Sequence, residues 1–308
     1  VLPSTLADAD LKPERMHSWE AGTDITLFDN RLSLGLTYYN TLSSNQIVVI
    51  PISNTTGYSS RYVNAGDIRN QGIELSLAVT PLRLSNSLTW QSRFNFSRNV
   101  GKVEKIAKGY DQYVYSWCAI YSDQDARVYA IAKEGERMGN LYGTGFKHTP
   151  DGSILVDESG LPVADPALVK LGNYNPDFIL GWSNSLRYKG FTLDFLLDWH
   201  QGGVFVPRDY YRNLYRRYHE TQSTFSATFL KLREVSIGYD LPKRWLSHTP
   251  IKALNFSIVG RNLWMWTKGQ DMVDPEAVTY EGNSVTPGVE EMSYPTMRSL
   301  GFSVHATF

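Results

Sequence analysis

Asp194, Asp198 and His200 are the residues in this sequence whose types and spacing best suit acid–base chemistry. All three stand at even spacings, so an extended strand would place them on one face. Two carboxylates and an imidazole can exchange protons and orient water. No recognisable nucleophile motif accompanies them, and a polar strand face needs no chemistry to explain it. We therefore assign them no catalytic role.

Other reactive residue types are scattered. The six histidines have no metal-ligand spacing, and the single cysteine, Cys118, excludes an internal disulfide and a cysteine-based zinc site. Neither a phosphate-binding loop nor a G-x-S-x-G turn is present. The Asp123–Asp125 and Asp151–Gly152 segments begin like calcium loops but do not continue the pattern. We expect no enzyme, no metal site and no cofactor.

One segment of the longest predicted loop is rich in aromatic side chains. Rigid aromatic rings stack on sugars and anchor protein interfaces, so these residues are candidate contacts for a ligand or a partner. The alternative is that they pack their own loop against its neighbours. The candidates are Tyr113, Tyr115, Trp117 and Tyr121.

Composition narrows the class of protein. The chain has 308 residues and a net charge of -1, which argues against a nucleic-acid partner. No stretch approaches the roughly 18 apolar residues of a membrane helix. A chain of this kind is either soluble or a membrane β-barrel, in which only every second strand residue is apolar.

Alternation of apolar and polar residues with period 2 runs through the whole chain and predicts nine strands. In the seventh strand the alternation slips between Leu232 and Val235, which predicts a β-bulge at Arg233–Glu234. The predicted strands cover residues 19–27, 32–39, 73–80, 88–97, 178–188, 191–200, 227–239, 254–258 and 299–308.

The connections favour a transmembrane antiparallel β-barrel over a soluble β-sandwich, which alternates in the same way. Short turns alternate with four long polar connections, at 41–69, 98–173, 201–227 and 265–293, as in outer-membrane barrels. Lys231 is the only lysine clearly within a predicted strand. Tryptophan and tyrosine gather at the strand ends, where an interfacial girdle would lie.

In a barrel, the positions of the short turns also indicate which way each strand crosses the membrane. Short turns face the periplasm, so we expect a periplasmic C-terminus and extracellular long loops. Nine strands beginning outside cannot close a bacterial barrel, so we expect earlier strands elsewhere in the parent protein. The charged residues opposite the apolar faces should line the lumen. They are Glu74, Arg93, Asp194, Asp198 and His200.

Several short motifs recur in an order and spacing that resemble the C-terminal barrel of SusC/RagA-like TonB-dependent transporters. Each motif is weak alone, but together they cover nearly the whole chain. They include Ser18-Trp19-Glu20-Ala21-Gly22, Asn70-Gln71-Gly72-Ile73-Glu74-Leu75, Leu171-Gly172-Asn173, Leu230-Lys231-Leu232-Arg233-Glu234-Val235, Arg261-Asn262-Leu263 and Asp274-Pro275-Glu276.

This resemblance implies that residues 1–308 are the C-terminal portion of a 22-stranded plugged barrel, whose plug and earlier strands lie outside this chain. It implies import of an oligosaccharide or peptide across the outer membrane, coupling to the TonB complex and a SusD-like surface lipoprotein. It also makes the terminal strand, with Phe302, Val304 and Phe308, a barrel-assembly signal. Two alternatives stay open: a soluble carbohydrate-binding sandwich and an outer-membrane barrel enzyme.

Overall fold

The structure is a computed structural model of the chain, and it shows an all-β protein. No helix among the described residues has the length and hydropathy needed to cross a membrane. The residues that it describes are 4–6, 10–64, 66–84, 88–119, 127–207, 224–269, 273–276, 280–281, 284–285, 287–290 and 294–308.

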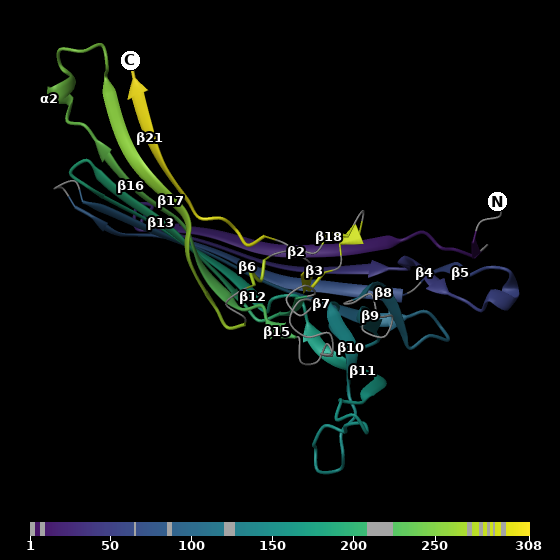
Figure 1. Cartoon of the computed structure of the whole chain (residues 1–308). Helices are drawn as coiled ribbons and strands as arrows, with labels where there is room; N and C mark the ends of the chain where they lie inside the picture. The colour runs from purple at the N-terminus through teal and green to yellow at the C-terminus, as the bar shows by residue number, and fades with distance from the viewer. Residues whose placement is uncertain are drawn as a thin grey trace.

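The main body is a nine-stranded antiparallel sheet, which we call the wall. Its strands are strongly bent and pair in sequence order (Figure 1). They are β2 (Arg15–Leu27), β3 (Leu32–Ser44), β6 (Gly66–Arg83), β7 (Thr89–Ile106), β12 (Phe178–Tyr188), β13 (Phe191–Gln201), β16 (Phe229–Asp240), β17 (Ala253–Thr267) and β21 (Ser299–Thr307).

All nine predicted strands are confirmed, and they occupy one sheet. The β-sandwich alternative is therefore wrong, because a sandwich needs two facing sheets. At the end of the sheet that carries the long connections, several strands extend further than the alternation predicted. For example, β7 continues to Ile106 and contains Lys102 and Lys105, so Lys231 is not the only lysine in a wall strand.

The predicted bulge in β16 is present. Relative to β13, the pairing moves from Leu197↔Leu232 to Leu196↔Glu234, so Arg233 is an extra residue. On the other side, Asn262 and Leu263 of β17 lie opposite Arg233. Asn262 has φ 52°, a left-handed conformation that asparagine tolerates better than most residues.

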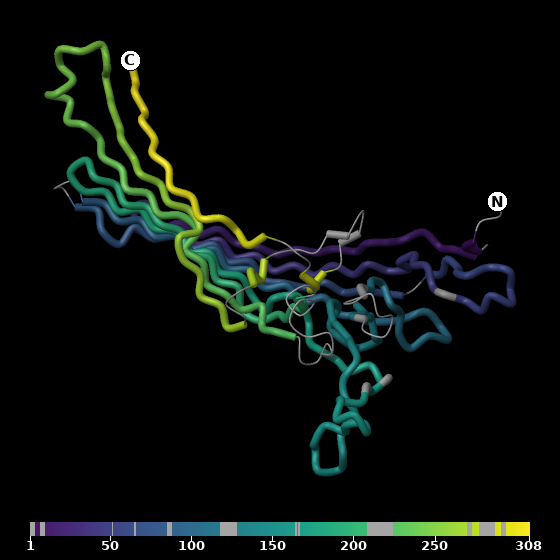
Figure 2. The backbone as a smooth tube through the Cα atoms, viewed as in Figure 1, coloured from purple at the N-terminus to yellow at the C-terminus, as the bar shows by residue number. Residues whose placement is uncertain are grey.

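Short connections join the strands at the end of the sheet where the C-terminus lies (Figure 2). Lys189 and Gly190 have φ values of 46° and 88°, as in a type I′ turn, whose twist matches that of a hairpin. The connection between β16 and β17 contains the short helix α2 (Lys243–Leu246). Tight turns at this end agree with the predicted asymmetry of the connections.

The described residues of the long connections include several short strands, which the sequence did not predict. Their largest unit is a four-stranded sheet of order β11-β10-β9-β8 at the opposite end of the wall. The segment before β2 contains β1 (Thr5–Leu6), which pairs with β5 (Ser60–Asn64) of the first long connection. The connections also include η1 (Asn54–Thr56). Their other strands are β4 (Ile47–Pro51), β8 (Gln112–Ala119), β9 (Arg127–Lys133), β10 (Asn140–Phe146), β11 (Ala164–Asn173), β14 (Val204–Pro207), β15 (Phe225–Ser226), β18 (Tyr280–Glu281), β19 (Ser284–Val285) and β20 (Val289–Glu290).

The best-buried apolar core lies in these connections and not in the wall. It joins three separate connections through parallel pairing of β14 with β20 and packing on β9 and β10. We call the unit formed by β8–β11, β14 and β20 the cap. The buried members of its core cluster are Val128, Ala130, Leu141, Val206 and Val289.

Candidate functional site

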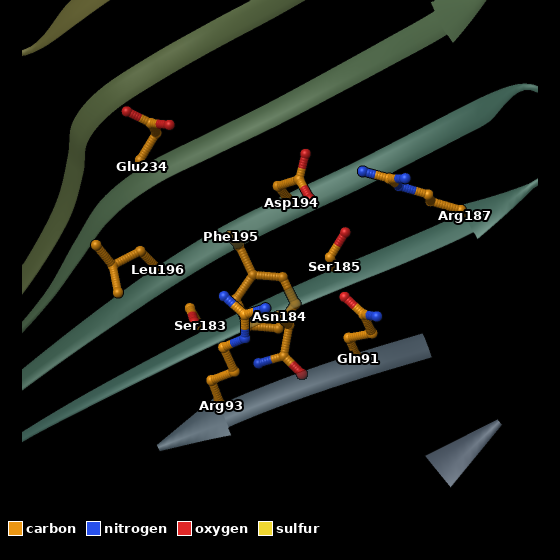
Figure 3. Close-up of a pocket in the computed structure, with 10 residues that line it drawn as sticks. All are labelled: Gln91, Arg93, Ser183, Asn184, Ser185, Arg187, Asp194, Phe195, Leu196 and Glu234. Atoms are coloured by element: carbon orange, nitrogen blue, oxygen red, sulfur yellow. The ribbon is translucent and has the colours of Figure 1, made fainter. Parts of the chain in front are cut away.

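The predicted lumen-facing residues lie on the polar face of the wall, where alternation brings charges from several strands together. Glu74 and Asp198 line one cavity of about 450 Å³. Arg93 and Asp194 line another of about 420 Å³ (Figure 3). His200 lies beside Asp198, with Nε2 3.5 Å from Oδ2. The structure therefore groups these five residues on one face, and their exposure to a lumen stays a prediction.

Three charged side chains of the polar face near the short turns differ from charged side chains near the cap. Within the described part of the chain, the side chains of Arg93, Arg187 and Asp194 form no hydrogen bond or ion pair. Near the cap, by contrast, Arg69 pairs with Glu104 at 2.9 Å and Arg137 pairs with Asp177 at 2.8 Å. These three side chains are thus without a partner in the part of the chain that the structure describes.

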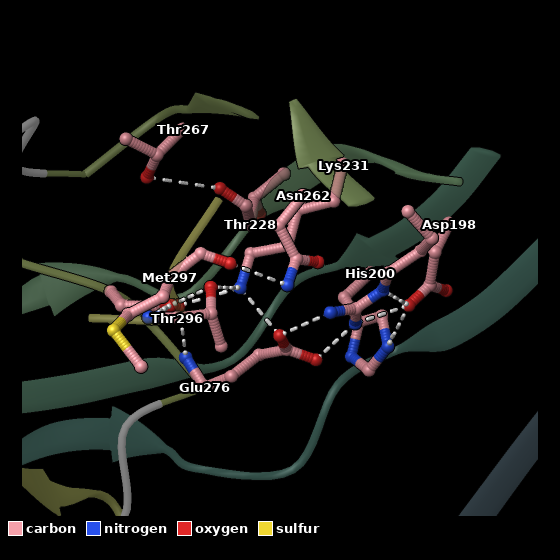
Figure 4. A network of polar contacts seen from close by, with 11 residues as sticks. Asp198, His200, Thr228, Lys231, Asn262, Thr267, Glu276, Thr296 and Met297 are labelled. Atoms are coloured by element: carbon pink, nitrogen blue, oxygen red, sulfur yellow. Dashed lines mark hydrogen bonds and ion pairs between the residues drawn. The ribbon is translucent and has the colours of Figure 1, made fainter. Parts of the chain in front are cut away.

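Among the described residues, Lys231 is the most buried charged residue of the wall strands. It faces inward from β16, and its side chain is only 2% exposed. Nζ lies 2.7 Å from Asp274 Oδ1 and 2.5 Å from Glu276 Oε2, both in the connection between β17 and β21 (Figure 4). Nζ also lies 5.0 Å from the Phe229 ring centroid, a cation–π distance. A buried ammonium needs such partners, because desolvation without them is costly.

Arg233 extends this network toward β13. The guanidinium donates hydrogen bonds to Asp198 Oδ2 and also to the Glu276 carboxylate. Since the bulge inserts Arg233 between inward-facing Lys231 and inward-facing Glu234, it concentrates charge at one level of the wall. Two cations therefore hold two acidic residues of one connection against the sheet.

The carboxylates of this connection are strongly biased toward their charged forms. Burial raises the pKa of Asp274, but hydrogen bonds from Lys231 and Thr296 outweigh burial and hold the pKa at about 2. Burial also opposes ionisation of Glu276, yet Arg233 and Lys231 lower the pKa of that group. The ion pairs are therefore intact at neutral pH.

Asp198, His200 and Glu276 have ligand atoms within 4.8 Å of one another, a spacing that could hold a metal ion. The Arg233 guanidinium already bridges the two carboxylates. Its permanent positive charge satisfies both acids and would repel a metal cation. The cluster is an ion-pair network, and its geometry does not favour a metal centre.

The loop aromatics occupy different environments. Tyr113 and Tyr115, on β8, are partly buried within the cap and pack on its buried apolar residues, with ring centroids 6.3 Å apart. Burial raises the pKa of both hydroxyls. Trp117 is 53% exposed, and Tyr121 lies outside the described residues. Trp117 is thus the most accessible of the described three, and a ligand or partner role for any of them stays a prediction.

The C-terminal strand presents its apolar side chains outward at an edge of the wall. Phe302 is 85% exposed, Val304 is 52% exposed and Phe308 is 71% exposed. On β17, Ile258 pairs with Phe302 and continues this apolar face. Their role as an assembly signal stays a prediction.

Sequence reasoning missed the roles of Lys231, Arg233, Asp274 and Glu276, although it noted their motifs. One usable signal was a lysine inside a strand, where a partner is needed. The partner itself could not be read, because Asp274 is 43 residues away along the chain.

Comparisons with known proteins agree with this architecture. Residues 3–263 match the family described as TonB dependent receptor-like, beta-barrel. TonB-dependent receptor P3 of Formosa agariphila is 26% identical over 100% of this chain and 35% of its own length. TonB-dependent receptor SusC of Bacteroides thetaiotaomicron is 22% identical over 61% of this chain and 19% of its own length.

A solved structure of the RagAB peptide importer in the open-open state has a TM-score of 0.75 and 19% identity. The match covers 97% of this chain and 35% of that chain. The present chain thus spans about a third of such proteins. Receptors of this family are transporters rather than enzymes, as the sequence predicted. The chain belongs to the TonB-dependent receptor-like β-barrel family, and its wall is part of an outer-membrane barrel.

Proposed function

We propose that the parent receptor imports an oligosaccharide or a peptide across the outer membrane and is driven by the TonB complex. The observation that carries the proposal is the two-faced wall of a family member. One face is apolar and exposed, as lipid requires, and the other carries charged cavities. Such a wall can separate a membrane from a polar passage.

We further propose that residues 1–308 form the C-terminal portion of the barrel, and that a plug and further strands complete it. The chain spans 35% of the length of receptor P3, which leaves room for both. The side chains of Arg93, Arg187 and Asp194, without partners among the described residues, suit a docked plug. The short turns would face the periplasm and the cap would face outward.

A SusD-like surface lipoprotein is the proposed partner at the cap. A relative is the SusC receptor, and a similar structure is the RagAB peptide importer. Exposed Trp117 offers a rigid aromatic anchor on this side of the wall.

Two measurements test these proposals. Deletion of the parent gene should abolish uptake of either labelled oligosaccharides or labelled oligopeptides, and the arm affected identifies the cargo class. Affinity purification of the tagged receptor from outer membranes should recover a surface lipoprotein. Unchanged uptake of both classes would reject the import proposal, and a receptor recovered without any lipoprotein would reject the partner.

A further inference from the structure

The connection between β17 and β21 touches the polar face of the wall with both of its limbs. The outgoing limb carries Asp274 and Glu276, and the returning limb carries Thr296 and Met297. Thr296 donates its backbone N–H and its hydroxyl to Asp274 Oδ2, at 3.1 and 2.7 Å. Asn262 Nδ2 donates to the Met297 carbonyl at 3.1 Å. The two limbs are therefore joined to each other and to the wall.

We propose that Lys231 and Arg233 form a latch that holds residues 273–276 and 294–298 on the wall as a fixed strap. Because of this latch, the strap is a permanent part of the polar face and does not swing away as a lid. The latch fixes the conformation of one connection, whatever the cargo or the partner of the receptor.

Burial separates the latch from an ordinary surface ion pair. The side chains of Lys231 and Asp274 are each 2% exposed. Arg261 and Glu234, on the same pair of wall strands, form an ion pair at 2.9 Å, but their side chains are 64% and 41% exposed. Solvent screens the exposed pair, whereas losing one partner of the buried pair leaves an uncompensated charge. Arg261–Glu234 is thus a matched control.

The wall is shaped locally to receive the strap. The extra residue in β16 adds Arg233 to the inward-facing Lys231, and the irregularity it creates in β17 places Asn262 beside the returning limb. Both contacts arise from one two-against-one irregularity in neighbouring strands. A regular ladder would offer the inward-facing lysine without this added guanidinium and amide.

The cap is attached to the wall at a second place, separate from the strap and without these charges. The turn between β9 and β10 bonds to β7, with Val103 N–H donating to the Glu136 carbonyl at 2.9 Å and Met138 N–H to the Gly101 carbonyl at 2.8 Å. Ala132, completely buried beside this attachment, can report on it separately. If the latch is specific, its loss should release the strap and leave this second region closed.

The test uses the full-length receptor in outer membranes, in a background without other cysteines. Val273 is 8% exposed, so V273C reports opening of the strap by its rate of maleimide labelling, and A132C reports on the second attachment. Lys231→Met and Arg233→Gln should each speed labelling at position 273 by about tenfold or more, because a buried carboxylate loses its partner. Arg233→Lys should restore much of the protection, and Arg261→Gln should change the rate by less than about threefold.

The outcomes are decisive when heat-modifiability shows an assembled barrel. Unchanged labelling at position 273 in Lys231→Met and Arg233→Gln would overturn the latch, and so would equal acceleration at positions 273 and 132. If Lys231→Met does not assemble, Thr296→Val serves instead, since it removes the hydroxyl that donates to Asp274. That variant should speed labelling at position 273 by about threefold, and no change would count against the latch.

Discussion

The wall and the cap are stabilised against different surroundings. In the wall, the outward apolar side chains are exposed, with Ile258 at 64% and Phe302 at 85%. In the cap, Val128 and Leu141 are completely buried. A cap with its own core can remain folded in water, whereas the apolar face of the wall requires lipid. The long connections are therefore a folded layer with contacts of their own.

Topology gives the largest expected contrast, because labelling should be all or none. Cysteine variants at Asn54 and Asp151, in long connections, should react with a membrane-impermeant maleimide on intact cells. A cysteine at Asn30, in a short turn, should react only after the outer membrane is permeabilised. All three residues are exposed, so access depends on the side of the membrane. The reverse pattern would invert the assigned orientation.

Truncation in the cap core should separate the two regions energetically. Leu141→Ala should destabilise the cap by about 2–5 kcal/mol, because it leaves a cavity at a fully buried position. The heat-modifiable barrel should persist. Pulse proteolysis of the purified receptor measures the cap, and Leu155→Ala, at a position 39% exposed, is the control. Simultaneous loss of the barrel would show that the regions fold as one unit.

A charge on the outer face tests the wall. Leu75→Arg should cost about 2–4 kcal/mol near the bilayer midplane, as measured by urea unfolding in liposomes. Asn95→Arg, on the polar face, introduces the same side chain beside a cavity and should cost much less. Equal costs for both substitutions would refute the assignment of faces.

Acid should weaken the ion pairs that hold the strap on the wall, and this effect should be smaller than those of the substitutions above. The pKa of Asp274 is lowered to about 2 in the folded protein, so its contribution is complete above its usual value of roughly 4. That contribution, about 2 kcal/mol, is lost as the pH falls toward 2. Pepsin cleavage of the strap should therefore increase between these values. Asp274→Asn should weaken this dependence and leave only the part due to Glu276, whose pKa is also lowered. An unchanged dependence would show that Asp274 does not contribute to it.

The wall could be predicted because one apolar face imposes period 2 on every strand. The slip in β16 was visible because a single extra residue, Arg233, reverses the alternation. The irregularity in β17 was not visible, because it contains two residues, Asn262 and Leu263, and two residues leave the apolar–polar alternation unchanged. The outer parts of β7 were missed since Lys102 and Lys105 interrupt the alternation there.

The sequences of the cap and the strap show no period-2 alternation from which their structure could be predicted. Strands β9 and β10 are short and largely buried on both faces, so their residues do not alternate. Their core also depends on Val206 and Val289, which come from two other connections. Contacts of this kind are set by tertiary packing over long separations, which a single sequence does not reveal.

The irregularity at β16 and β17 also limits how this stretch of the gene can change length. Deleting the codon for Arg233 would make Leu232 and Glu234 neighbours, and because these residues already pair with the neighbours Leu197 and Leu196, the ladder would become regular with every face kept. Deleting Arg233 together with one further residue of β16 would exchange the two faces on one side of the gap. Deleting the codons for Asn262 and Leu263 together would preserve the faces of β17. Natural length variation should therefore occur as a single residue at the bulge of β16 and as a pair of residues in β17.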